Sequence, residues 1–197
     1  MADIRELSRR TLETTVSIVA GLKPDQLGSP TPCSEWDLRA LLAHMIGQHY
    51  GFAAAARGEE KDRTVWDDRP IGDDPAAQYA QAVHEVTTAF REEGLLGRRF
   101  WLPEIHETVR FPAPTAISFH LLDYVVHGWD VARSLGVVAR FDDDLVAAAL
   151  AVGEQIPEGE SRLEPGAQFR PTVAVTDDAS PMDRLIAMTG RSPSWPD

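Results

Sequence analysis

The chain has 197 residues, a hydrophobic content of 43% and a formal net charge of -12. This length and composition suit a globular domain that builds its own core. The acidic excess repels phosphate backbones and anionic lipid heads, so we expect neither a nucleic-acid partner nor a membrane surface. The single cysteine, Cys33, rules out an intrachain disulfide, and the charged N-terminus lacks the apolar stretch of a signal peptide. We therefore expect a cytoplasmic protein.

Apolar periodicity and helix-ending signals predict helices in chain order over residues 5–21, 34–57, 75–94, 115–135 and 142–155, with a short one over 181–188. In the second, Ser34 is the expected N-cap and Asp37 resembles the partner residue of a capping box. The charged stretch 59–74, with Pro70 and Gly72, is expected to be an exposed loop.

Residues 98–111 keep no single period, which leaves a short hairpin or an extended crossover open. Several helices of this length, joined by loops of varied length, predict an all-α helical bundle. We expect one domain over residues 1–197, in which the proline-rich residues 155–197 form an irregular C-terminal extension.

The helix expected over 115–135 carries one line of polar residues on an otherwise apolar surface. His120, Asp123, His127, Asp130 and Ser134 follow each other at spacings of three or four, which places them on one helix face. Because the other faces are apolar, the helix should be buried on most sides. The polar line must then face water or a polar cavity, since unpaired polar groups in a core are costly.

Asp123 and His127 stand at i and i+4, a spacing that lets a carboxylate and an imidazole converge on one metal ion. A third ligand must come from elsewhere, and His44 is the best candidate. It shares its face with small residues that form a shallow groove for another helix or a ligand: Ala40, Gly47 and Gly51. His49 lies nearer the middle of the apolar face and should be the more buried histidine.

Other interpretations of the same residues stay open. A polar stripe is usually a solvated face, and Asp123 with His127 can be a simple ion pair. His120 shares their face and competes as a ligand. Asp130 either serves the site or pairs with Arg133 at i+3. Cys33 is expected to be a small packed residue, His49 and His84 are expected in the core or on the surface, and no catalytic residue can be named.

Two segments carry a resemblance to a known family: "TPCSEWDLRALLAHMIG" over residues 31–47 and "LLDYVVHGWDVARSLG" over residues 121–136. They resemble the DinB/YfiT-like superfamily, and more closely its actinobacterial branch with the N-terminal domain of mycothiol-dependent maleylpyruvate isomerase. The ending "FRPTVAVTDDASPMDRLIAMTGRSPSW" is similar to the tail of small metal-binding members of that branch.

The resemblance implies a four-helix bundle with a long crossover and a divalent metal held by His44, Asp123 and His127. Asp123 stands where the isomerase branch has Glu, a longer arm with the same charge. Two nitrogens and one carboxylate leave open positions on a zinc-like ion, with nickel or iron as further options. Such an ion can activate a thiol, and the resemblance favours mycothiol as cosubstrate.

The leading hypothesis is therefore a metal-dependent enzyme of the thiol S-transferase or thiol-dependent isomerase class, acting on a small molecule. One alternative is a non-catalytic metal- or ligand-binding bundle. Another is a biosynthetic cyclase or isomerase that uses the same cavity without a thiol. The sequence leaves a homodimer open and assigns no role to residues 59–110.

Overall fold

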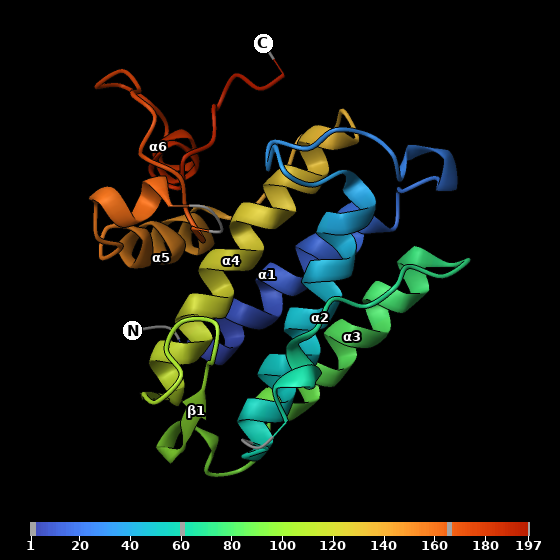
Figure 1. The fold of residues 1–197 in the computed structure, drawn as a ribbon, viewed down its shortest axis with the longest axis vertical. Helices are drawn as coiled ribbons and strands as arrows, with labels where there is room; N and C mark the ends of the chain where they lie inside the picture. Colours follow the sequence, from blue (N-terminus) through green and yellow to red (C-terminus); the bar gives the residue numbers. More distant parts are fainter. Residues whose placement is uncertain (1–2, 60–61, 165–166, 197) are drawn as a thin grey trace.

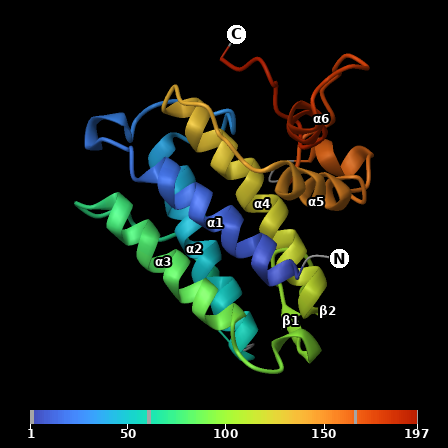
Figure 2. The same ribbon diagram turned by 180° about the vertical axis from the view of Figure 1, so that it is seen from behind.

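The computed structural model describes residues 3–59, 62–164 and 167–196. Across these ranges the protein is mostly helical, with one short antiparallel sheet. The elements are α1 (Ile4–Val19), α2 (Leu38–Arg57), α3 (Pro75–Phe90), β1 (Arg99–Trp101), β2 (Arg110–Pro112), α4 (Ala113–Ser134), α5 (Asp143–Gly153) and α6 (Pro181–Met188). Helices α1 to α4 lie side by side as a bundle, and α5 and α6 lie on the other side of α4 (Figures 1 and 2). The expected all-α bundle and the short hairpin near 98–111 are confirmed.

Aspartates cap the first three helices. The side chains of Asp3, Asp37 and Asp74 each accept a hydrogen bond from a backbone N–H of the following helix, which satisfies a donor that the helix itself leaves unpaired. The prediction that Ser34 caps α2 is wrong. The Thr31 hydroxyl donates to the carbonyls of Cys33 and Trp36, and this turn keeps the preceding residues out of the helix. Helix α2 therefore begins at Leu38.

Helix α4 is buried on two opposite sides, which explains its nearly continuous apolar sequence. One side, with Ile117 and Tyr124, faces the core that α1, α2 and α3 share. The other side packs against α5 and α6, and its members are Leu121, Leu122, Val125, Val126 and Trp129. The polar line of α4 therefore has little free surface, and each of its members must find water or a partner.

The connection between α2 and α3 is exposed along most of its described residues, as expected, but one buried side chain anchors it to α2. Residues 60 and 61 lie outside the described residues, but further along Trp66 is only 4% exposed. Its ring covers Gly51, where an added Cβ would lie 2.3 Å from the ring, and Gly47 similarly faces the backbone of Asp67. The stripe of small residues on α2 thus accommodates this connection rather than a helix or a ligand. Close backbone approach of this kind needs glycine.

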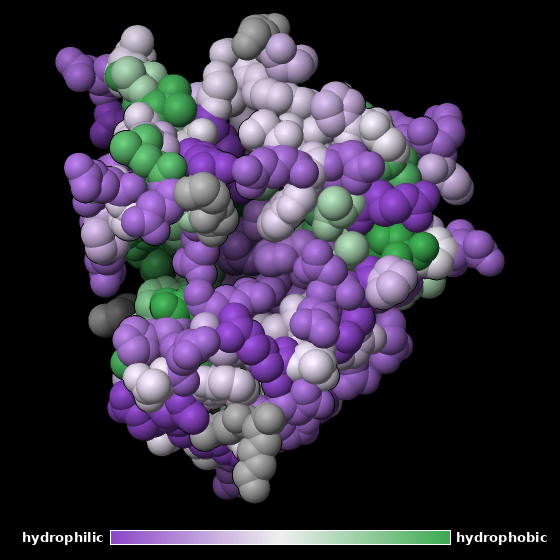
Figure 3. Space-filling view, in the orientation of Figure 1, coloured by the Kyte–Doolittle hydropathy of each residue, from purple (hydrophilic) through white to green (hydrophobic). Residues whose placement is uncertain are grey.

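The face drawn in Figure 3 is mostly hydrophilic, with a polar hollow in front of the middle of α4, between the α5–α6 lobe and the bundle. Among the described residues, none of the helices combines the length and the apolar character that crossing a bilayer would need.

Candidate metal site

Helices α2 and α4 bring the three predicted ligands together. The ring of His44, on α2, lies edge-on to the ring of His127, on α4, with 5.7 Å between the ring centroids. Asp123 lies one turn before His127 on α4, and its Oδ1 is 3.3 Å from His127 Nε2. Residues far apart in the sequence therefore form one cluster at the surface of the bundle.

The cluster is not arranged as a finished metal site. In the part of the chain that the structure describes, no three or more His, Cys, Asp or Glu side chains are placed so that they could hold a metal ion. His44 Nδ1 lies 3.4 Å from Asp68 Oδ1. The chemistry of the donor set nevertheless fits a zinc-like ion, because two imidazoles and one carboxylate are one of the ligand sets of catalytic zinc sites. Metal binding by His44, Asp123 and His127 stays a prediction.

Asp130 contacts the His127 ring at Nδ1, the nitrogen opposite the one that faces Asp123. Its Oδ2 lies 3.0 Å from His127 Nδ1, and its side chain is fully buried. A carboxylate in this position holds the imidazole ring in place and makes Nε2, which lies 3.3 Å from Asp123 Oδ1, the nitrogen that would bind an ion after releasing its proton. Asp130 pairs with His127 and Arg191 instead of with Arg133, which lies over the ring of Trp129.

The charges of the cluster are strongly coupled. Burial disfavours a charged imidazole, but the carboxylates of Asp123 and Asp130 outweigh it and raise the pKa of His127 to about 9. Burial likewise disfavours the charged carboxylate of Asp123, but His127 outweighs it and lowers the pKa of Asp123 to about 2. Burial and the neighbouring charge of His127 both lower the pKa of His44. His44 is therefore a neutral donor, and the Asp123 side chain, 31% exposed, opens the cluster to solvent.

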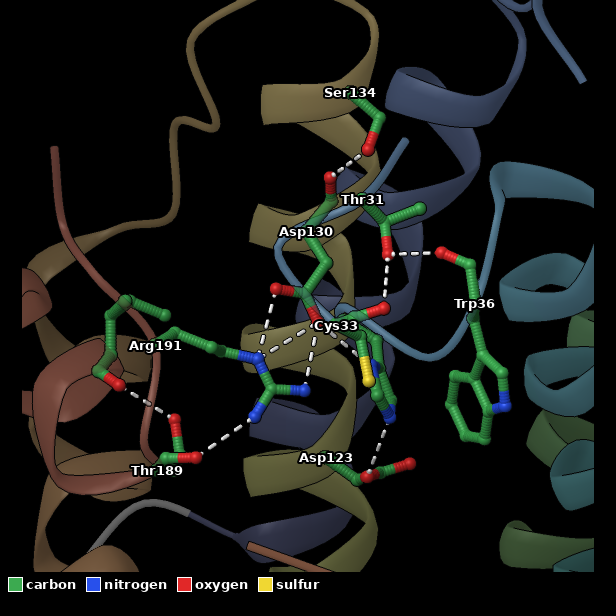
Figure 4. A network of polar contacts seen from close by, with 10 residues as sticks. Thr31, Cys33, Trp36, Asp123, Asp130, Ser134, Thr189 and Arg191 are labelled. Carbon is green, nitrogen blue, oxygen red and sulfur yellow. Dashed lines mark hydrogen bonds and ion pairs between the residues drawn. The ribbon is translucent and has the colours of Figure 1, made fainter. Parts of the chain in front are cut away.

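Trp36 and Cys33 border the cluster from the turn before α2. The Trp36 ring lies 4.6 Å from His44 and 6.1 Å from His127 between centroids, so it forms an apolar wall beside both imidazoles. Burial raises the pKa of the Cys33 thiol, so this cysteine is not an activated nucleophile. Figure 4 shows Cys33 between Arg191 and Trp36, close to Asp130.

Two acidic residues near the cluster escaped the sequence analysis. Asp68 lies in the α2–α3 connection, beside His44. Glu104 lies in the loop between β1 and β2, where its Oε2 accepts a hydrogen bond from Gln48 Nε2 at 2.8 Å. Gln48 follows His44 by one turn of α2. Burial raises the pKa of Glu104, and the carboxylate of Asp123 raises it further. Neither residue belongs to a periodic pattern, so the sequence held no signal for them.

His120, named as a further site candidate, faces the core instead of the surface cluster. It is fully buried, and its Nε2 lies 3.3 Å from His49 Nδ1. The ring of His49 stacks on Tyr124 at 4.0 Å, so both histidines belong to the interior of the bundle. The expectation that His49 is more buried than His44 is confirmed.

The fold and the cluster together define a DinB-type helical bundle with a candidate metal centre. The family model of the mycothiol maleylpyruvate isomerase N-terminal domain matches residues 8–132, and the chain belongs to this family. The matched range contains all the cluster residues on α2 and α4 but ends before α5 and α6.

Similar proteins extend the comparison over nearly the whole chain. Two proteins of Mycobacterium tuberculosis, from strains CDC 1551 / Oshkosh and ATCC 25618 / H37Rv and both described as uncharacterized, are 30% identical over 187 residues. These alignments cover 93% of this chain and 95% of each relative. The crystal structure of a histidine-to-alanine mutant of mycothiol-dependent maleylpyruvate isomerase superposes with a TM-score of 0.58 at 13% identity. The match covers 76% of this chain and 66% of the isomerase, just under two thirds. At this low identity it shows a shared fold.

Proposed function

We propose that the protein is a divalent-metal-dependent enzyme of the thiol S-transferase or thiol-dependent isomerase class, with mycothiol as the cosubstrate. His44, Asp123 and His127 would hold the ion. Zinc is the metal we expect first, with nickel or iron as alternatives. The observation that supports this most directly is the contact of His127 with the buried Asp130. A simple ion pair between Asp123 and His127 would not require this second carboxylate, whereas histidine ligands of metals commonly have one.

The residues of the cluster have separate roles in this proposal. Asp130 keeps a proton of His127 on Nδ1, so Nε2 would be the nitrogen that binds the ion, releasing its own proton to solvent as the ion binds. Asp123, partly exposed, faces the solvent from which a reactant arrives. Trp36 excludes water from one side of both imidazoles. A divalent ion in such an open site, when bound, lowers the pKa of a thiol and supplies a thiolate at neutral pH.

The family supports the choice of thiol. The matching family model and the structurally similar isomerase both carry mycothiol in their names. We also propose that the whole chain works as a single domain, because α4 contributes one side to the bundle core and the other side to the core with α5 and α6.

The test begins with elemental analysis of untagged protein, followed by calorimetric titration of the zinc-loaded protein with mycothiol. We expect about one metal ion per chain, and thiol binding that the His127→Ala variant loses together with the metal. A His84→Ala variant serves as the matched control, since His84 is exposed on α3. Wild-type protein that holds metal but binds no mycothiol at millimolar concentration would refute the thiol-dependent function. It would favour a metal-binding bundle or a thiol-independent enzyme.

A further inference from the structure

Arg191 lies directly after α6 and reaches across to the centre of α4. Its Nε donates to both carboxylate oxygens of Asp130, at 2.9 and 3.0 Å, and its Nη2 donates to Asp130 Oδ2 at 2.9 Å. The Arg191 side chain is 8% exposed and that of Asp130 is fully buried. Figure 4 shows the guanidinium facing the carboxylate edge-on. A planar fork of this kind fixes the plane of the carboxylate as well as its charge.

The backbone turn that follows α6 holds Arg191 in place. The Arg191 Nη1 donates to the Thr189 carbonyl at 3.2 Å, and Thr189 itself is buried and donates its hydroxyl to the Ile186 carbonyl. Gly190 adopts φ +84, and an added Cβ there would lie 2.7 Å from the Arg170 carbonyl oxygen. The chain can make this close turn only with glycine, and the turn aims Arg191 at α4.

The fork bears directly on the orientation of His127. Asp130 Oδ2 accepts from Arg191 and also lies 3.0 Å from His127 Nδ1. Rotation of the carboxylate about its Cβ–Cγ bond would break both interactions together. The side chain of Asp130 therefore has one orientation in which all its partners are satisfied, and in that orientation it fixes the His127 ring.

We propose that Arg191 is a positioning residue of the candidate metal centre: by fixing Asp130, it holds His127 so that Nε2 is presented to a divalent ion. This inference rests on the proposed metal site. It assigns to the C-terminal extension, which lies outside the matched family range, a part in metal binding. Arg191 would touch neither the ion nor the reactant.

The experiment compares substitutions at Arg191 with a matched control in the same lobe. Arg162 is also a buried arginine, 4% exposed, but it donates to the carbonyls of Pro157 and Met188 and has no contact with the cluster. Zinc affinity is measured by competition with a chromophoric chelator, and the visible spectrum of the cobalt-loaded protein reports the geometry around the ion. Thermal unfolding of the same samples records the effect of each substitution on stability.

We expect Arg191→Met to weaken zinc binding about 10- to 100-fold and to change the cobalt spectrum. The zinc affinity of Arg191→Lys should lie between those of wild type and Arg191→Met. Arg162→Met should lower the melting temperature but keep the zinc affinity and the spectrum. Because Arg191 acts through Asp130, combining Arg191→Met with Asp130→Asn should weaken binding no more than Asp130→Asn does alone.

Three results would overturn the inference. The first is unchanged zinc affinity in both Arg191 variants. The second is a loss of zinc affinity in Arg162→Met as large as that in Arg191→Met. The third is a double variant whose loss of zinc affinity equals the sum of the losses of the two single variants. If Arg191→Met does not fold, Arg191→Lys, which keeps the charge but loses the fork, decides the question by the same measurement. Wild-type protein without zinc affinity would refute the metal site itself. Wild-type protein that binds zinc but no thiol would leave the role of Arg191 intact.

Discussion

Replacing His120 with glutamine should make the protein less sensitive to acid. His120 and His49 lie fully buried in the bundle, 3.3 Å apart between His120 Nε2 and His49 Nδ1. Their other ring nitrogens have no hydrogen-bond partner among the described residues. Burial disfavours the charged imidazole and lowers the pKa of His120 to about 3, although Asp123 favours the charge. The folded protein therefore keeps His120 neutral in mild acid.

The sign of the effect follows from this lowered pKa. The unfolded chain takes up a proton on this histidine as the pH falls below 6.5, while the folded protein does not. Each pH unit by which the pH falls below 6.5 then favours the unfolded state by about 1.4 kcal/mol for this histidine. Between about pH 7.5 and about pH 5, His120 alone should lower the free energy of unfolding by about 2 kcal/mol.

The assay is urea unfolding of wild type and His120→Gln at both pH values. Glutamine cannot titrate, and its amide can still reach the neighbouring His49, so the variant should lose about 2 kcal/mol less than wild type on acidification. All other titrating groups are shared and cancel in this difference. The control His84→Gln, exposed on α3, should behave like wild type. Equal losses in wild type and His120→Gln would refute the reasoning.

Three further substitutions test the surroundings of the cluster. Gly51→Ala places a Cβ 2.3 Å from the Trp66 ring and should lower the free energy of unfolding in urea by about 1–3 kcal/mol; unchanged stability would contradict the packing. Asp68→Asn removes the charge 3.4 Å from His44 Nδ1 and should weaken zinc binding, measured by chelator competition, about 10-fold; wild-type affinity would speak against a supporting role. Glu104→Gln removes a carboxyl whose raised pKa suits proton transfer and should lower kcat in a mycothiol-dependent assay while metal content stays the same; an equal loss of metal would assign Glu104 to binding instead.

Helix geometry made half of the candidate site predictable. Asp123 and His127 share a face because they stand at i and i+4, and this follows from the sequence once the helix is recognised. The choice of His44 as third member rested on the stripe of small residues beside it and was supported by the family resemblance, because helical periodicity alone favoured His49 as the more buried histidine. The ring separation of 5.7 Å shows that these residues do lie together in the folded chain.

The remainder of the site could not be predicted, because it depends on irregular segments. Asp68 and Arg191 reach the cluster from a connection and from a turn, where no periodic spacing tells which way a side chain points. The same reason explains the error at the start of α2. Ser34 and Asp37 are both good caps, and the choice between them was made by hydrogen bonds of the Thr31 hydroxyl that no helix pattern records.

The polar line of α4 shows how neighbouring elements decide what a residue does. His120 meets only the bundle core and stays neutral there. His127 meets His44 of α2 and the partly exposed Asp123 and becomes part of a candidate site. Asp130 is fully buried, and a buried carboxylate is strongly unfavourable without a partner, so it depends on Arg191 from beyond α6. The C-terminal lobe is thus joined to the bundle by a charge pair as well as by apolar packing. Because breaking that pair would leave Asp130 unpaired inside α4, the lobe and the site should lose their structure together.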